Sequence, residues 1–108
     1  MVKDLFFVAR IRETARLVGV PLVFARSPEE LEQAMGRAPR FALVDLTADL
    51  DYERIFTLTE RMCLPVLAFT THVLARQTQP WHGRCQRVVT KEKLTQDLGF
   101  LLLQGLGA

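Results

Sequence analysis

Three polar side chains with the chemistry to handle a phosphoryl group each end or follow a short apolar run of the sequence. Asp45 ends "FALVD", Thr70 ends "LPVLAFT", and Lys91 directly follows "RVVT". A carboxylate can act as a nucleophile toward a phosphoryl group. A hydroxyl can hydrogen-bond the phosphoryl oxygens, and an ammonium supplies a compact positive charge. An acid near the N-terminus, Asp4, could join Asp45 in holding a Mg²⁺ ion, which prefers oxygen ligands.

The apolar runs that carry these residues predict a parallel sheet. They cover residues 21–25, 41–46, 64–70 and 87–90, and their hydrophobicity is continuous rather than alternating. Continuous hydrophobicity indicates burial on both faces, which is typical of parallel strands covered by helices. Ligands of such sheets collect at the carboxyl ends of the strands. The polar residues at the ends of the runs are therefore expected to converge on one edge.

A helix with a clear N-terminal signal is predicted over residues 27–36. Ser27 is the expected N-cap, Pro28 the first-turn proline, and Glu30 the acid of a capping box. Gly36 is the residue expected to close the helix.

Three further helices are predicted between and after the runs. Residues 51–62 carry one apolar face opposite a charged one. Residues 92–104 form the final helix, with Thr90 as its expected N-cap. Residues 73–82 contain Pro80 and little apolar periodicity, which predicts a short or irregular helix that Trp81 packs against the core.

The N-terminal segment has two readings that periodicity cannot separate. Residues 5–18 fit an amphipathic helix ending at Gly19, whereas "DLFFVA" fits an apolar strand equally well. If the segment is a helix, only residues 1–3 remain for a first strand, which is then short or incomplete.

The alternation of strands and helices predicts one α/β domain over residues 1–108. Its expected architecture is an open parallel five-stranded sheet with helices on both faces. Apolar residues make up 49% of the chain and charged residues 24%, which is typical of globular proteins. A net charge of +2 is too small to indicate a nucleic-acid partner. No uncharged run is long enough to span a bilayer, and we expect a cytoplasmic protein without membrane association.

The motifs "LVDL", "VLAFTTH" and "RVVTK" resemble those of the receiver domains of two-component response regulators, along nearly the whole chain. The resemblance implies a flavodoxin-like fold and a role in signal transduction and phosphorelay. It places Asp45 at the phosphoacceptor, Thr70 at the switch hydroxyl and Lys91 at the lysine that contacts the phosphoryl group. It also implies Mg²⁺ as a cofactor and a histidine kinase as a partner.

The sequence departs from the receiver pattern at three places. Receivers carry adjacent acids at the end of the first strand, but Lys3 and Leu5 flank Asp4. A Met-Pro pair commonly follows the phosphoacceptor, where this chain has "LTAD". Arg87 or Val88 stands where receivers have a switch aromatic. These departures indicate an atypical receiver or pseudo-receiver.

The functional prediction is a stand-alone, atypical receiver-like domain that acts in signalling through protein contact and is not an enzyme. One alternative is a working phosphoreceiver, phosphorylated on Asp45 with Mg²⁺. A second alternative is a small-ligand-binding or enzymatic subunit on a flavodoxin-like scaffold.

The apolar face of the final helix is wider than packing on one core requires. This excess indicates an interface, either with a second copy of the chain or with another protein. The candidate interface residues are Leu98, Leu102, Leu103 and Leu106.

The cysteines and histidines do not indicate a metal site. Cys63 and Cys85 are expected to be buried free thiols. His72 and His82 lack a nearby carboxylate pair, so solvent-facing or hydrogen-bonded side chains are expected.

Overall fold

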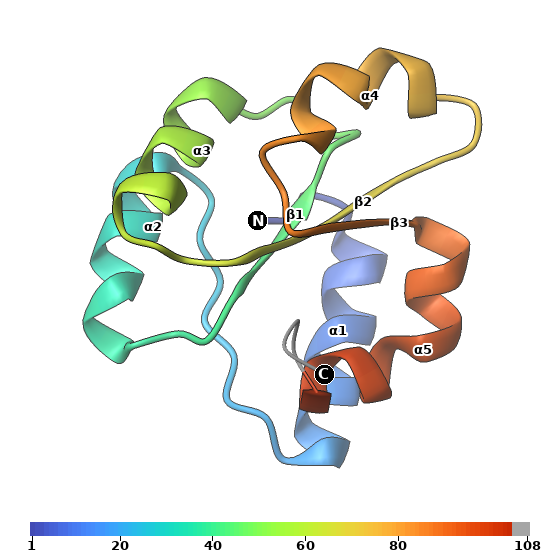
Figure 1. The fold of residues 1–108 in the computed structure, drawn as a ribbon. Coiled ribbons are helices and arrows are strands. Elements are labelled where there is room, and N and C mark those ends of the chain that lie inside the picture. Colours follow the sequence, from blue (N-terminus) through green and yellow to red (C-terminus); the bar gives the residue numbers. More distant parts are fainter. Residues whose placement is uncertain (105–108) are drawn as a thin grey trace.

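The computed structural model describes residues 1–104 as a layered α/β fold. Figure 1 shows the helices α2 and α3 on one side of the sheet and α1 and α5 on the other. The predicted α/β class with helices on both faces of a parallel sheet is therefore confirmed. The elements in chain order are α1 Leu5–Val18, α2 Pro28–Ala34, the short 3-10 helix η1 Met35–Arg37, β1 Ala42–Asp45, α3 Tyr52–Arg61, β2 Val66–Thr70, α4 Ala75–His82, β3 Arg87–Thr90 and α5 Lys91–Gln104.

The sheet that residues 1–104 form has three strands, in the order β1-β2-β3, and all pairs are parallel. The prediction of five strands is not confirmed. Residues 21–25 form no strand, and of the first segment only Met1 makes sheet-like hydrogen bonds, with Leu43 and Asp45 of β1. Neither residues 1–3 nor residues 21–25 form a strand of the sheet, so the predicted first and second strands are absent from the described residues.

The N-terminal segment is a helix, because capping at both ends and an apolar face favour it. The Asp4 carboxylate accepts hydrogen bonds from the backbone N–H groups of Phe6 and Phe7 at 3.0 and 3.2 Å. Gly19 ends α1 in the left-handed conformation, at φ 73°. Phe7 and Ile11 are buried on its inner face.

The start of α2 follows the prediction and its end does not. Ser27 accepts a hydrogen bond from Glu30 N at 3.2 Å, and the Glu30 carboxylate reaches back to Arg26 N at 3.0 Å. The chain continues past Gly36 as η1 and reverses at Ala38, which has a φ of 51°. Gly36 is therefore not the closing residue.

The remaining helices lie close to their predicted positions. Asp51 caps α3 by accepting a hydrogen bond from Arg54 N at 3.3 Å. Thr90 accepts one from Lys93 N at 3.1 Å, in the first turn of α5. The short helix α4 contains Pro80, as predicted, and Trp81 packs against the core on the α2 and α3 side.

The final helix is buried more completely than the sequence suggested. Leu98 and Leu102 are 2% and 3% exposed because they pack with α1 in the core. These two candidates are therefore core residues of the single chain and not free surface. Leu103 and Phe100 of the same helix are exposed, at 47% and 60%. Leu106 lies outside the described residues.

One cysteine differs from its expectation. Cys63 is exposed, at a left-handed φ of 54° just after α3, whereas Cys85 is half-buried. Cys63 lies in the turn after α3, where its backbone N–H donates to Glu60 O at 3.2 Å. Both thiols are free.

Within residues 1–104, no helix is both long enough and apolar enough to cross a bilayer.

Candidate functional site

The strand register brings the predicted residues to the same edge of the sheet. Asp45 pairs with Phe69, so it lies one position before Thr70 on the neighbouring strand. Thr70 pairs with Thr90, and Lys91 follows Thr90 at the start of α5. Asp45 ends β1, Thr70 ends β2 and Lys91 directly follows β3, so all three lie at the carboxyl edge of the sheet.

The Asp45 side chain is turned into its own loop. It is 5% exposed, and its Oδ1 accepts hydrogen bonds from Thr47 N at 2.8 Å and from Thr47 Oγ1 at 2.6 Å. This arrangement is the side-chain-to-backbone turn that Asp favours after a strand. The carboxylate therefore shapes the loop between β1 and α3.

The hydroxyl of Tyr52 covers the same loop from α3. It lies 2.7 Å from the carbonyl oxygen of Asp45 and 2.6 Å from that of Ala48. Burial, together with the nearby negative charge of Asp45, raises the pKa of the Tyr52 hydroxyl. The hydroxyl stays protonated, and its single hydrogen is shared between these two carbonyl oxygens.

Lys91 is paired with Asp4 rather than with Asp45. The Lys91 ammonium lies 3.1 Å from Asp4 Oδ2 and 5.0 Å from the centre of the Phe7 ring. The hydrogen bond from Lys91, and then the one from Phe7 N, lower the pKa of the Asp4 carboxyl. No ion pair joins Lys91 to Asp45 within residues 1–104.

The Thr70 hydroxyl faces α4. It lies 3.0 Å from the hydroxyl of Thr78, which in turn lies 2.8 Å from His82 Nε2. Thr70 and Thr78 are 4% and 5% exposed. His82 is therefore hydrogen-bonded, as expected from the sequence, and connects this buried pair of hydroxyls to the surface end of α4.

Three of the four carboxylate oxygens of Asp4 and Asp45 already have partners within the chain, which leaves few oxygen ligands for a divalent cation. One oxygen of Asp4 caps α1 and the other is paired with Lys91. One oxygen of Asp45 accepts a hydrogen bond from Thr47 N. In the part of the chain that the structure describes, no three His, Cys, Asp or Glu side chains are grouped to hold a metal ion.

An aromatic cluster that the sequence did not reveal joins α3 to α4. The ring centres of Tyr52, Phe56 and Trp81 lie 5.5 to 6.2 Å apart in pairs. The Arg84 guanidinium lies 5.7 Å from the Phe56 ring centre. The i, i+4 spacing of Tyr52 and Phe56 was the available signal; Trp81 lies too far along the chain for any local pattern to find.

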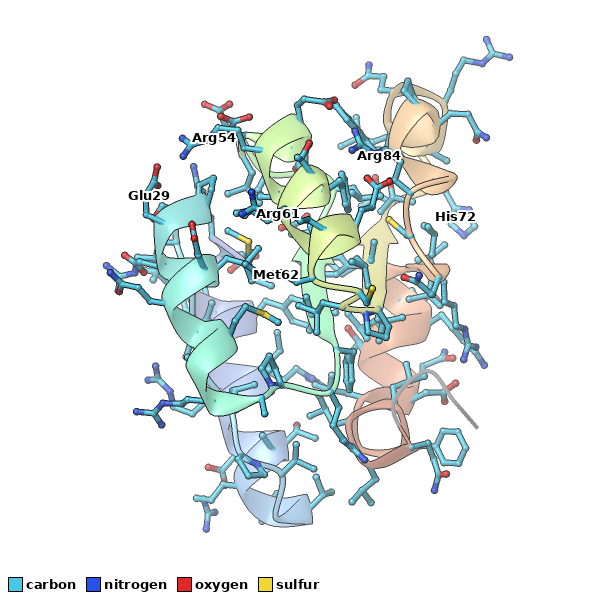
Figure 2. The ribbon with its side chains drawn as sticks, turned by 60° about the vertical axis from the view of Figure 1, so that its left-hand side comes forward. Glu29, Arg54, Arg61, Met62, His72 and Arg84 are labelled. Carbon is cyan, nitrogen blue, oxygen red and sulfur yellow. The ribbon has the colours of Figure 1, made fainter. Side chains whose placement is uncertain are left out.

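Charged side chains at the surface join α3 to the segment after α4 and to α2. Arg84 pairs with Glu53 at 2.9 Å and with Glu60 at 2.5 Å, both on α3. Arg54 pairs with Glu29 of α2. Figure 2 shows Arg54 beside Glu29 between α3 and α2, and Arg84 beside α3.

The fold and the edge residues define an α/β protein with a small parallel sheet whose carboxyl edge is closed by internal hydrogen bonds and one ion pair. No protein-family model matches the chain, and no curated protein or solved structure is significantly similar to it.

Proposed function

We propose that the protein is an atypical receiver-like domain that works in signalling through protein contact and does not turn over a substrate. One observation carries the proposal. The carboxylate, hydroxyl and ammonium that a receiver would use all reach one edge of the sheet, and each is held by a different internal partner. The Asp45 carboxylate is hydrogen-bonded to Thr47, and the Thr70 hydroxyl is hydrogen-bonded to Thr78. The Lys91 ammonium is paired with the Asp4 carboxylate.

Phosphoryl transfer to Asp45 would require these partners to separate. An incoming phosphoryl group needs a free carboxylate oxygen with cationic groups around it. The Lys91 ammonium already has a carboxylate partner, and the Thr70 hydroxyl faces α4. The edge therefore favours a domain that keeps one conformation and presents a fixed surface.

Exposed apolar side chains support contact as the mode of action. Leu5 and Phe6 are 79% and 89% exposed directly beside Asp4 at the carboxyl edge. Phe100 and Leu103 are exposed on α5. Large apolar side chains exposed together commonly mark interaction surfaces. We assign homodimerisation to the α5 surface formed by Phe100 and Leu103.

A phosphodonor assay tests the proposal. The protein is incubated with acetyl phosphate and Mg²⁺, and its intact mass is measured beside that of Asp45→Asn. The proposal expects no added phosphoryl group in either protein. A phosphoryl group that appears in the wild type and is absent from Asp45→Asn would instead establish the second candidate, a working phosphoreceiver. The observation that favours this second candidate is the common edge of Asp45, Thr70 and Lys91.

A further inference from the structure

The strand β3 has an open edge on the side away from β2. The central strand β2 pairs with β1 on one side and with β3 on the other, and all of its residues are buried. Among residues 1–104, β3 pairs only with β2, and its first residue, Arg87, is exposed while the others are half-buried. Figure 1 shows β3 at the front of the sheet, with no helix drawn across it. The outer edge of β3 therefore has no neighbouring strand within the described residues.

Two residues of β3 direct their backbone groups to this open edge. Gln86 N donates to the first carbonyl oxygen of β2 at 3.0 Å, so the backbone groups of Gln86 face β2. Because alternate residues of a strand face opposite edges, Val88 and Thr90 also face β2, whereas Arg87 and Val89 face away from it. Within residues 1–104, neither Arg87 N–H nor Val89 N–H donates a hydrogen bond. Backbone donors and acceptors at such partly buried positions are stabilised by gaining partners.

We propose that β3 pairs with β3 of a second copy of the chain, antiparallel and about a two-fold axis at Val88, so that the two sheets become one. In this register Arg87 lies opposite Val89 of the second copy, and the two residues exchange both of their backbone hydrogen bonds. The axis repeats the pair, so every outward backbone group of both strands gains a partner. Such a two-fold contact closes at the dimer. The inference rests on the homodimerisation proposed for α5 and adds the strand contact that accompanies it.

Exposed charges of opposite sign support a second copy as the partner. Arg87 and Glu92 are both exposed, and neither makes an ion pair within residues 1–104. Arg87 begins β3 and points to the same face as Val89, which packs on the α1 and α5 side. Glu92 lies in the first turn of α5, directly after β3. Since the start of one antiparallel strand lies beside the end of the other, Arg87 of each copy is brought toward Glu92 of its partner.

The helix α5 extends the contact on the same face of the sheet. Gly99 faces α1, because a side chain there would lie 3.4 Å from Val18 Cγ1. Leu98 and Leu101 face the core, so the next position round the helix, Phe100, lies on the side away from α1. Because α1 lies over β2 and α5 contacts β3, that side is directed toward the open edge. Pairing of the two strands brings the exposed Phe100 sides of both helices toward each other.

Exchange of the two charges tests the pairing. Arg87→Glu alone and Glu92→Arg alone should each raise the dimer dissociation constant by about tenfold or more, as measured by sedimentation equilibrium without a phosphodonor. The double variant restores opposite charges across the axis and should regain the dissociation constant of the wild type. Arg10→Glu, at an exposed residue of α1, is the control and should leave it unchanged.

Loss of a backbone donor tests the strand contact itself. Val89→Pro removes an outward N–H and no hydrogen bond to β2, and proline is tolerated on edge strands. The variant should raise the dissociation constant by about tenfold or more, whereas Val89→Ala, which keeps the N–H, should change it little. Thermal unfolding shows whether both variants fold. In the wild type, hydrogen exchange at Arg87 N–H and Val89 N–H should slow as the protein concentration rises through the dissociation constant.

The possible failures are distinguishable. A protein that stays monomeric at all concentrations would overturn both this inference and the homodimerisation proposed for α5. A dimer that is insensitive to the single charge changes, and whose Arg87 and Val89 N–H groups exchange at a rate independent of concentration, would overturn the strand pairing alone. Assemblies that grow beyond a dimer would overturn the two-fold arrangement. None of these results depends on phosphorylation, which the phosphodonor assay measures separately.

Discussion

The ammonium of Lys91 lies 3.1 Å from a carboxylate oxygen of Asp4, a residue 87 positions earlier in the chain. This ion pair joins the first residue of α5 to the N-cap of α1. Within residues 1–104 the ammonium is paired with Asp4 and makes no ion pair with Asp45, so Asp4 and Lys91 neutralise each other.

Removing the Asp4 charge should change how stability depends on pH. The pKa of Asp4 is lowered in the folded protein, so its contribution is present above the unfolded pKa of about 3.9 and is lost as the pH falls through the lower folded value. Urea unfolding should therefore show that Asp4→Asn destabilises at pH 7 and has less effect at pH 2. Lys91→Gln should remove the same interaction, and the double variant should lose little more. Additive losses would contradict the pairing.

The Asp45 carboxylate is expected to act as a structural acceptor. Asp45→Ala leaves Thr47 N–H without its partner, which should cost about 1–3 kcal/mol of unfolding free energy. Asp45→Asn keeps one oxygen as an acceptor and should cost less. Urea unfolding of both variants measures the difference. No loss in Asp45→Ala would show that the contact with Thr47 contributes nothing, and equal losses would show that an amide oxygen cannot replace the carboxylate.

The aromatic cluster is expected to stabilise the packing of α3 and α4. Phe56 is fully buried, so Phe56→Ala should lower the unfolding free energy by about 3–5 kcal/mol. The chain has one tryptophan, Trp81, so its fluorescence reports the same packing and should change. Leu17→Ala, at a residue 69% exposed on α1, is the control and should alter neither quantity.

The two thiols should differ in reactivity. Cys63 is exposed, whereas burial raises the pKa of the Cys85 thiol to about 11. Since the thiolate is the reactive form, iodoacetamide at pH 8 should modify Cys63 first, as peptide mapping by mass spectrometry can show. In Cys63→Ser the native protein should react slowly and the urea-unfolded protein quickly. Rapid modification of Cys85 in the native variant would argue against its burial.

The exposed residues of α5 should control self-association. Phe100→Ser combined with Leu103→Ser replaces two exposed apolar side chains, and the variant should be monomeric at concentrations where the wild type dimerises. Sedimentation velocity measures the change. Val73→Ser removes an apolar side chain that is 89% exposed in the loop before α4 and serves as the control. A dimer that survives the double substitution would place the interface elsewhere.

The elements with local signals could be predicted from the sequence. Ser27, Pro28 and Glu30 determine where α2 begins, and the apolar runs at β1, β2 and β3 became parallel strands. Residues 21–25 show why such runs are insufficient. A strand requires a paired neighbour, and these residues pair with no strand of the described sheet. The wide apolar face of α5 could equally indicate an interface or a second packing partner within the chain. The structure shows the latter for Leu98 and Leu102, because α1 packs against them.

The edge residues could be located from the sequence, but their partners could not. Strand-end positions for Asp45 and Thr70 follow from the parallel sheet. The pairing of Lys91 with Asp4 depends on how α1 and α5 sit side by side, and the contact of Thr70 with Thr78 depends on the path of α4. Such contacts between distant segments leave no periodic pattern in the sequence.

The oligomeric state with and without a phosphodonor tests the central claim most directly. Light scattering on the purified protein, before and after acetyl phosphate and Mg²⁺ are added, should give the same dimer mass, and Asp45→Asn should give that mass too. A dimer that forms only after the phosphodonor is added, and not in Asp45→Asn, would contradict the account and show that phosphorylation controls the contact.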